Sequence, residues 1–182
     1  MSEKPKSGET PDRADSPPGL AAHPLALAAL VVALGVLVPM VFHAVGLGPI
    51  FLPMFLPIAV GAFFLSPGVA AAVGLVTPLI SSLTTGMPPW MPPVAPVLTV
   101  ELMIFGALIS WLNRRGLQPL VVLTLALIAD RLLLLAVVLV VAPLFGWPER
   151  AFSIGAVLSG FPGVLLILAV VPPLLRRLAP DP

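Results

Sequence analysis

After its first two dozen residues, the chain is almost entirely apolar and carries charged side chains at only a few positions. Hydrophobic residues make up 59% of its 182 residues and charged residues 9%, and the mean hydropathy is +1.12. A water-soluble domain of this size would expose an apolar surface that is prone to aggregate. We therefore predict that nearly all of the chain after about residue 24 lies in a lipid bilayer.

The apolar part divides into six segments, each compatible with one membrane span of roughly 20–25 residues. We predict an all-α polytopic membrane protein, with a six-helix substrate-binding bundle over residues 23–178. Residues 1–22 are polar, rich in Pro and Gly and charged with both signs, which predicts a disordered cytoplasmic tail. The predicted spans are Pro24–Val45, Ile50–Leu65, Gly68–Leu83, Val97–Leu112, Leu120–Phe145 and Phe152–Leu175.

The basic residues predict the orientation of the bundle. They lie before the first span and after the fourth and sixth spans, and six crossings place all these positions on one side. By the positive-inside rule that side is the cytoplasm, so both termini are expected there, in the cell inner membrane. These residues are Lys4, Lys6, Arg13, Arg114, Arg115, Arg176 and Arg177.

A polar, Pro-rich stretch then falls outside, between the third and fourth spans. It contains the hydroxyls of Ser81, Ser82, Thr84 and Thr85, followed by Trp90. Hydroxyls offer directional hydrogen bonds and an indole offers a stacking surface, so Thr84 and Trp90 are candidate ligand contacts. The alternative is an interfacial Trp with hydroxyls that cap helices.

Three further side chains are candidate ligand contacts. Glu101 lies about one turn into the fourth span, where an ionised carboxylate is costly unless paired or hydrated. Its alternatives are a wet interface or a partnership with Arg131. The neighbours Asp130 and Arg131 point about 100° apart on one helix, so we expect them not simply to neutralise each other. For Arg131, the alternative to ligand contact is a structural ion pair with a residue of another helix. His43, near the outer end of the first span, is either a contact or an interfacial residue.

Small residues repeat every four positions on two predicted helices. Such spacing lets helices approach closely in lipid. For the alanines of the first span, the alternative to internal packing is a docking face for another membrane subunit. The positions are Ala22, Ala26, Ala29 and Ala33 on the first span, and Gly155, Ser159 and Gly163 on the sixth.

No catalytic or metal chemistry is indicated. The chain has no cysteine, phosphate-binding glycine loop or HExxH motif. Its two histidines, His23 and His43, lie roughly 30 Å apart on one helix and cannot share a metal. We expect no enzyme activity, no catalytic residue, no cofactor, no metal and no nucleic-acid partner.

The run from Leu52 to Leu112 resembles the substrate-binding S components of energy-coupling factor (ECF) vitamin transporters. The matching features come in order: a proline-containing second helix, Leu65-Ser66-Pro67-Gly68, the polar string from Ser81 to Pro89, Glu101-Leu102 and Gly106. The similarity is close over about residues 50–112. Elsewhere it is limited to the helix count and an alanine-rich first helix. The chain departs from the resemblance in having no tyrosine, which rules out a pocket built on tyrosine hydroxyls.

The resemblance implies a receptor without catalytic activity that binds a vitamin or precursor at the outer face. It implies docking through alanines of the first helix, Ala29 and Ala33 or Ala22 and Ala26, to a membrane T component driven by two ABC-type ATPases. Thr84, Trp90 and Glu101 fall where family members hold ligand. A planar heteroaromatic ligand with a charged or polar tail would suit Trp90 and Glu101. Two other hypotheses stay open: a small ion-coupled homodimeric carrier or channel using Glu101, and an assembly subunit without a ligand.

Overall fold

The computed structural model describes residues 24–44, 46 and 51–178. The predicted tail, Ala22 and His23 lie outside these residues. All regular structure in the described part is helical, and five helical segments are long and apolar enough to cross a membrane. The helices are α1 (Pro24–Ala44), α3 (Phe55–Ala62), α4 (Pro67–Thr85), α5 (Val94–Asn113), α6 (Pro119–Ala136), α8 (Ile154–Ser159) and α9 (Phe161–Leu178); the π-helical turn η3 (Val137–Val141) and α7 (Ala142–Leu144) extend α6.

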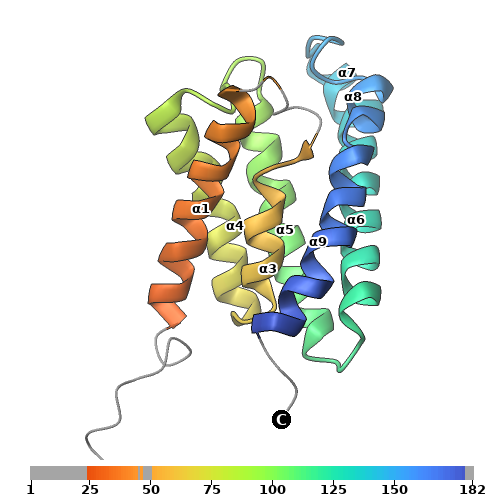
Figure 1. Ribbon diagram of the computed structural model, residues 1–182. Helices are drawn as coiled ribbons and strands as arrows, with labels where there is room; N and C mark the ends of the chain where they lie inside the picture. The colour runs from red at the N-terminus through yellow and green to blue at the C-terminus, as the bar shows by residue number, and fades with distance from the viewer. Residues whose placement is uncertain (1–23, 45, 47–50, 179–182) are drawn as a thin grey trace, which may run out of the picture.

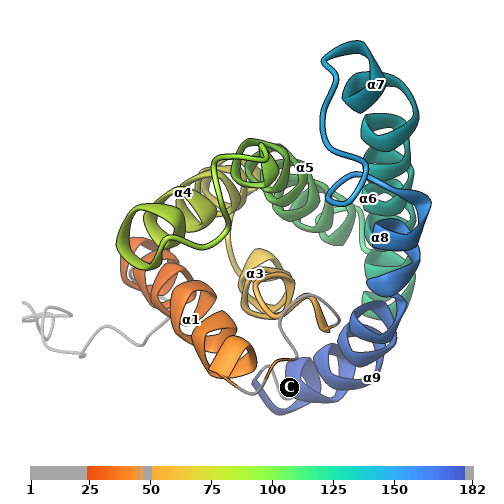
Figure 2. The same ribbon diagram turned by 90° about the horizontal axis from the view of Figure 1, so that it is seen from above.

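Helix α3 lies at the centre of the bundle. Seen from above, α1, α4, α5, α6 and α9 surround it (Figure 2), and α3 packs against α1, α4, α5 and α9. Its side chains Phe55, Ile58, Ala59 and Ala62 are therefore almost fully buried. This central position explains the run of apolar residues with no polar face in the predicted second span.

The second helix is much shorter than its predicted segment, Ile50–Leu65. At about 1.5 Å per residue, the eight residues of α3 extend only roughly 12 Å, against about 30 Å of hydrocarbon. Residues 53 and 54 form a turn, and α3 begins after them. Pro57 lies in the first turn of α3, where backbone N–H groups have no partner within the helix, so the missing N–H of proline costs no hydrogen bond. At the other end, Pro67 disfavours helix at Ser66 and begins α4.

Side chains of α5 bind the backbone where α3 ends. The Oγ of Ser110 donates to the carbonyl of Leu65 at 2.7 Å, and Nδ2 of Asn113 donates to the carbonyl of Phe63 at 3.0 Å. Carbonyls at a helix end lack partners within the helix, and an unpaired one is costly in lipid. These two bonds allow a helix to end inside a membrane protein.

Close approach of α4 and α5 depends on two glycines. A Cβ at Gly74 would overlap the carbonyl group of Leu102, and a Cβ at Gly106 would lie 2.8 Å from the carbonyl oxygen of Ala70. Small residues at such crossings let the helix backbones gain dispersion contacts in lipid. These glycines are not among the small-residue repeats that the sequence singled out.

The predicted repeat on the last segment packs only in part. A Cβ at Gly163 would lie 2.6 Å from the carbonyl carbon of Phe51, whereas Gly155 and Ser159 are exposed. The segment also breaks at Gly160, because Pro162 has no N–H to donate to the preceding turn.

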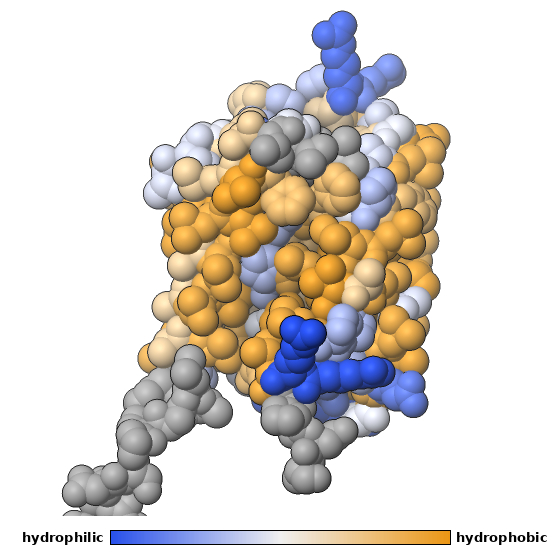
Figure 3. All heavy atoms as spheres, in the orientation of Figure 1, coloured by the Kyte–Doolittle hydropathy of each residue, from blue (hydrophilic) through white to orange (hydrophobic). Residues whose placement is uncertain are grey.

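The surface agrees with a membrane environment. Hydrophobic residues cover most of the face shown in Figure 3, and the most hydrophilic residues gather near its two ends. Exposed large side chains such as Leu25, Val41 and Leu132 face outward from the bundle. The protein is a multi-pass membrane protein, since such a surface is stable in lipid but not in water.

Candidate ligand pocket and buried charges

One end of the bundle contains a pocket of about 560 Å3, which we call the loop-end pocket. It lies between the ends of α1 and α4, the start of α5, the loop joining α4 to α5, and the turn before α3. Its volume falls within the usual range for small-molecule sites, which are mostly apolar with a few polar groups. The lining residues are Pro39, Met40, His43, Ala44, Leu52, Pro53, Met54, Phe55, Ser81, Thr85, Met87, Pro88, Pro89, Val94 and Leu98.

A second cavity, of about 710 Å3, lies between α1, α3 and α9. Its lining residues are all apolar and include Leu30, Val60, Phe64 and Leu174. A cavity without a polar side chain cannot orient a water-soluble ligand by hydrogen bonds. The loop-end pocket is therefore the better candidate for such a ligand.

Hydroxyls at the end of α4 hold the loop that covers the pocket. The Oγ of Ser81 donates to the carbonyl of Met87 and the Oγ of Ser82 to that of Pro88, each at 2.7 Å. Helix α4 ends at Thr85, and the next residue, Gly86, has φ 74° and donates its N–H to the carbonyl of Ser82. The left-handed conformation there suits glycine. The hydroxyl cluster thus shapes the pocket by fixing backbone.

The two predicted contacts on this part of the chain, Thr84 and Trp90, do not line the pocket. Thr84 is exposed, and its hydroxyl donates to the carbonyl of Ile80 at 2.7 Å, within its own helix. Trp90 is 47% exposed. Ligand contact by either residue stays a prediction, and it would need a ligand that extends beyond the pocket.

His43 is the predicted contact that does line the pocket. Its Nδ1 lies 2.8 Å from the carbonyl of Pro39, one turn earlier on α1. A carbonyl can only accept, so Nδ1 is the donor in this contact. His43 and Pro39 lie four residues apart and therefore on the same face of α1. The sequence spacing is enough to predict that these two residues are neighbours.

Glu101 is buried within the bundle, with only 5% of its surface exposed. Its Oε1 has no hydrogen-bond partner among the described residues. It follows Leu98, a lining residue, by about one turn of α5. Helix α5, which carries Glu101, packs against α6, which carries Asp130 and Arg131.

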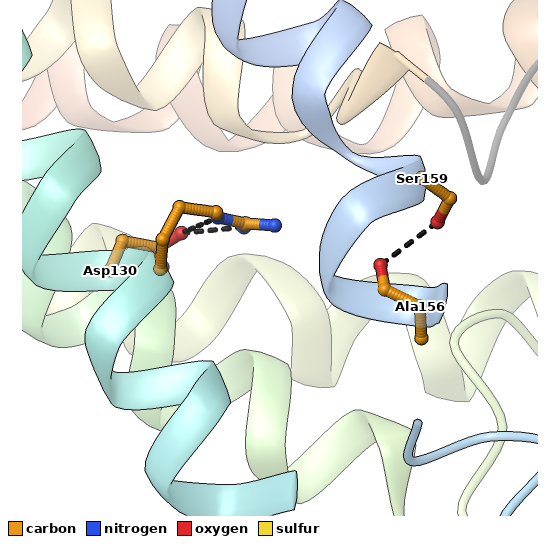
Figure 4. A network of polar contacts seen from close by, with 4 residues as sticks. Asp130, Ala156 and Ser159 are labelled. Atoms are coloured by element: carbon orange, nitrogen blue, oxygen red, sulfur yellow. Dashed lines mark hydrogen bonds and ion pairs between the residues drawn. The ribbon is translucent and has the colours of Figure 1, made fainter. Parts of the chain in front are cut away.

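Asp130 and Arg131 form an ion pair with each other. The Nε and Nη2 of Arg131 donate to Oδ2 of Asp130, at 3.0 Å and 2.6 Å. Figure 4 shows this pair extending from α6 toward the helix that carries Ser159. The expectation that these neighbours would not neutralise each other is wrong, because a long arginine side chain can fold back across the angle between adjacent positions. The alternative ion pair between Glu101 and Arg131 is not formed within the described residues.

Leu52 and the guanidinium group of Arg131 both lie close to Gly160. A Cβ added at Gly160 would lie 3.5 Å from both methyl carbons of Leu52 and 2.7 Å from Nη1 of Arg131. Leu52 also lines the pocket, and its φ of 49° is in the left-handed region, unusual for a branched side chain. Arg131 thus lies near one lining residue of the pocket.

Sequence reasoning missed the apolar floor of the pocket, formed by Leu52, Phe55 and Leu98. Their character does not differ from that of the other apolar residues in these helices, so the sequence carries no signal for them.

Among the described residues, no group of three or more His, Cys, Asp or Glu could hold a metal ion.

The predicted docking alanines that the structure describes lie on the surface. Ala26, Ala29 and Ala33 are exposed, whereas Val31 and Gly35 of the same helix are buried. The alanines therefore face away from the bundle.

Comparison with known proteins gives one match. Residues 23–175 match the model of a protein family described as ECF transporter, substrate-specific component. No curated protein and no solved structure matched the chain.

Proposed function

This chain belongs to the family of ECF transporter substrate-specific components, and we propose that it is the membrane receptor for a water-soluble vitamin or vitamin precursor. As a member of that family it is a transporter component and not an enzyme. The observation that carries the proposal is the loop-end pocket, which is large enough for a vitamin and mainly apolar, with polar groups from His43, Ser81 and Thr85.

The bundle crosses the cytoplasmic membrane six times, with both termini in the cytoplasm. The path of the chain supports this: α1 ends at the pocket end of the bundle and α4 begins at the opposite end, with α3 between them in the sequence (Figure 1). The start of α1, the connection from α5 to α6 and the end of α9 share that opposite end. It carries Arg114, Arg115, Arg176 and Arg177, so the positive-inside rule places the pocket outside.

The family implies a partnership with an ECF module that supplies the energy. We propose that the partners are a membrane T component and ABC-type ATPases, and that Ala29 and Ala33 contact the T component. Their exposure and their spacing of four residues support this, since small residues on one face permit close helix contact in lipid. Ala26 continues the same surface toward the start of α1.

Native mass spectrometry of the protein, purified gently from its own membranes, tests the receptor function. We expect a bound mass that matches a vitamin or precursor, and its loss in a variant that fills the pocket, Leu98→Trp. The variant Leu139→Trp, altered at an exposed position, is the control that should retain the mass. An empty homodimer that conducts protons or sodium in vesicles containing this chain alone would refute the proposal in favour of a carrier.

A further inference from the structure

We propose that the apolar cavity of about 710 Å3 between α1, α3 and α9 binds an acyl chain of an anionic phospholipid, whose phosphate contacts the arginines at the end of α9. We call this cavity the acyl groove. The inference goes beyond the proposed receptor function and does not depend on it. The lining residues of the groove include Leu27, Leu34, Val38, Leu56, Val60 and Leu174.

The acyl groove is open to the surrounding lipid. Leu30, Leu34 and Phe64 line it, yet each of these side chains is between 40% and 47% exposed. An unfilled apolar space leaves its lining atoms without dispersion contacts, and water does not stably fill a space that lacks polar partners. Lipid chains surround the hydrophobic surface of the bundle and are the molecules at hand to fill the groove.

The groove extends from one end of the bundle to about the middle of the membrane. On α1 its lining runs from Pro24 to Val38, a rise of roughly 21 Å. One leaflet contributes about half of the hydrocarbon thickness of roughly 30 Å. An acyl chain that enters at the start of α1 can therefore contact the groove along the full depth of its leaflet.

Two arginines lie where a lipid headgroup would be. Leu174 and Leu178 line the groove at the end of α9, and Arg176 and Arg177, both exposed, lie between them in the sequence. Arg177 follows Leu174 by three residues, a spacing that makes the two side chains neighbours on a helix surface. Strongly hydrophilic residues gather at the lower end of the face in Figure 3, the end at which α1 begins and α9 ends in Figure 1. A guanidinium group can bind a phosphate through two parallel hydrogen bonds.

The acyl groove and the proposed docking surface lie on different sides of α1. Ala29 and Ala33 are each two residues from Val31, which lines the groove, and two residues correspond to about 200° around a helix. A lipid in the groove therefore leaves the docking alanines uncovered. This separation favours a lipid over a helix of the partner as the occupant of the groove.

Native mass spectrometry of the full chain tests the site. The protein is stripped of lipid in detergent and incubated with equal amounts of phosphatidylglycerol and phosphatidylcholine that carry the same acyl chains. The double variant Arg176→Gln with Arg177→Gln removes the charge, and Leu34→Trp fills the groove. The matched controls are Arg114→Gln with Arg115→Gln, which removes two exposed charges after α5, and Leu139→Trp, at an exposed position that does not line the groove.

We expect the wild-type chain to retain the anionic lipid over the zwitterionic one by at least about fivefold, because basic residues at the membrane surface attract anionic headgroups. This preference should disappear in the variant at 176 and 177 and persist in the variant at 114 and 115. Leu34→Trp should retain less of both lipids, whereas Leu139→Trp should behave as wild type. If Leu34→Trp folds poorly, the arginine variants decide.

Three results would overturn the proposal: no retained lipid, equal retention of the two lipids by the wild-type chain, or a preference that survives in the variant at 176 and 177. Undiminished lipid retention by folded Leu34→Trp would also overturn it, since the chain would then bind elsewhere. Vitamin binding by the loop-end pocket is measured in the same samples and should be the same in all variants. Failure of the lipid site and failure of the receptor function are thereby distinguished.

Discussion

Arg131 donates two hydrogen bonds to Oδ2 of Asp130, the residue directly before it on α6, whereas Oδ1 of Asp130 has no partner in the described part of the chain. The guanidinium group of Arg131 thus pairs with Asp130, and Glu101 on α5 has no ion-pair partner among the described residues. The ion pair with Arg131 therefore contributes to the stability of the buried Asp130.

Removal of the arginine should destabilise the bundle. Arg131→Leu leaves Asp130 buried without its partner, and we expect a loss of about 3–5 kcal/mol in the free energy of unfolding. The double variant Asp130→Leu with Arg131→Leu should recover much of that loss, because no unpaired charge remains at this position. Unfolding in detergent micelles measures both. Arg114→Gln, at an exposed position, should change stability by less than about 0.5 kcal/mol. A single variant as stable as wild type would contradict the prediction.

A methyl group at the α4–α5 crossing should separate the two helices. Gly74→Ala places a Cβ against the carbonyl of Leu102, and we expect a cost of about 1–3 kcal/mol with a lower thermal midpoint. The matched control on the same helix is Gly68→Ala, because a Cβ there meets no atom within 4 Å. Equal thermal midpoints for the two variants would show that the crossing tolerates the added atom.

Loss of one loop anchor should loosen the cover of the pocket. Ser82→Ala removes the bond to the carbonyl of Pro88, which we expect to cost about 1 kcal/mol. Amide hydrogen exchange at the non-proline residues of the segment 86–91 should rise. The control is Thr84→Val, since that hydroxyl bonds only within its own helix. Unchanged exchange in Ser82→Ala would mean that the bond from Ser81 to Met87 and the prolines suffice to hold the loop.

A bulky side chain on the proposed docking surface should block transport but not binding. Ala33→Leu adds volume to the exposed face of α1, so the partner helix cannot approach. We expect vitamin uptake by cells to fall at least about tenfold while the purified variant still binds its ligand; the tenfold figure corresponds to about 1.4 kcal/mol of lost docking energy. Ala169→Leu makes the same change at an exposed position of α9 and should leave uptake normal. Normal uptake in Ala33→Leu would show that the docking face lies elsewhere.

The helical segments and their ends were largely predictable, because in lipid an apolar segment must form a helix and prolines restrict where helices begin and break. Pro67 does mark such a point, whereas the break at Gly160 falls inside the predicted span Phe152–Leu175. The second segment was not predictable in length. Its short helix depends on bonds from Ser110 and Asn113 to the carbonyls of Leu65 and Phe63, which lie some 45 to 50 residues away along the chain.

The candidate site was predictable only in its types of residue. Unusual polar residues in an apolar chain draw attention to the hydroxyl string, His43 and Glu101. In the structure these groups make different contacts. Ser81 and Ser82 hold backbone, Thr84 bonds within its own helix, and His43 lines the pocket. Ligand contact by Thr84, Trp90, Glu101 and Arg131 stays a prediction.

The sequence by itself determined that this protein is a helical membrane protein, since its scarcity of charge leaves no other stable environment. It also determined which residues are chemically able to hold a ligand. Only the tertiary structure decided that α3 lies at the centre, that Arg131 turns to Asp130 and not to Glu101, and that Ser81 and Ser82 hold the loop over the pocket. The physical reason is that these relationships depend on side-chain conformation and on helices distant in the chain, about which local composition carries no information.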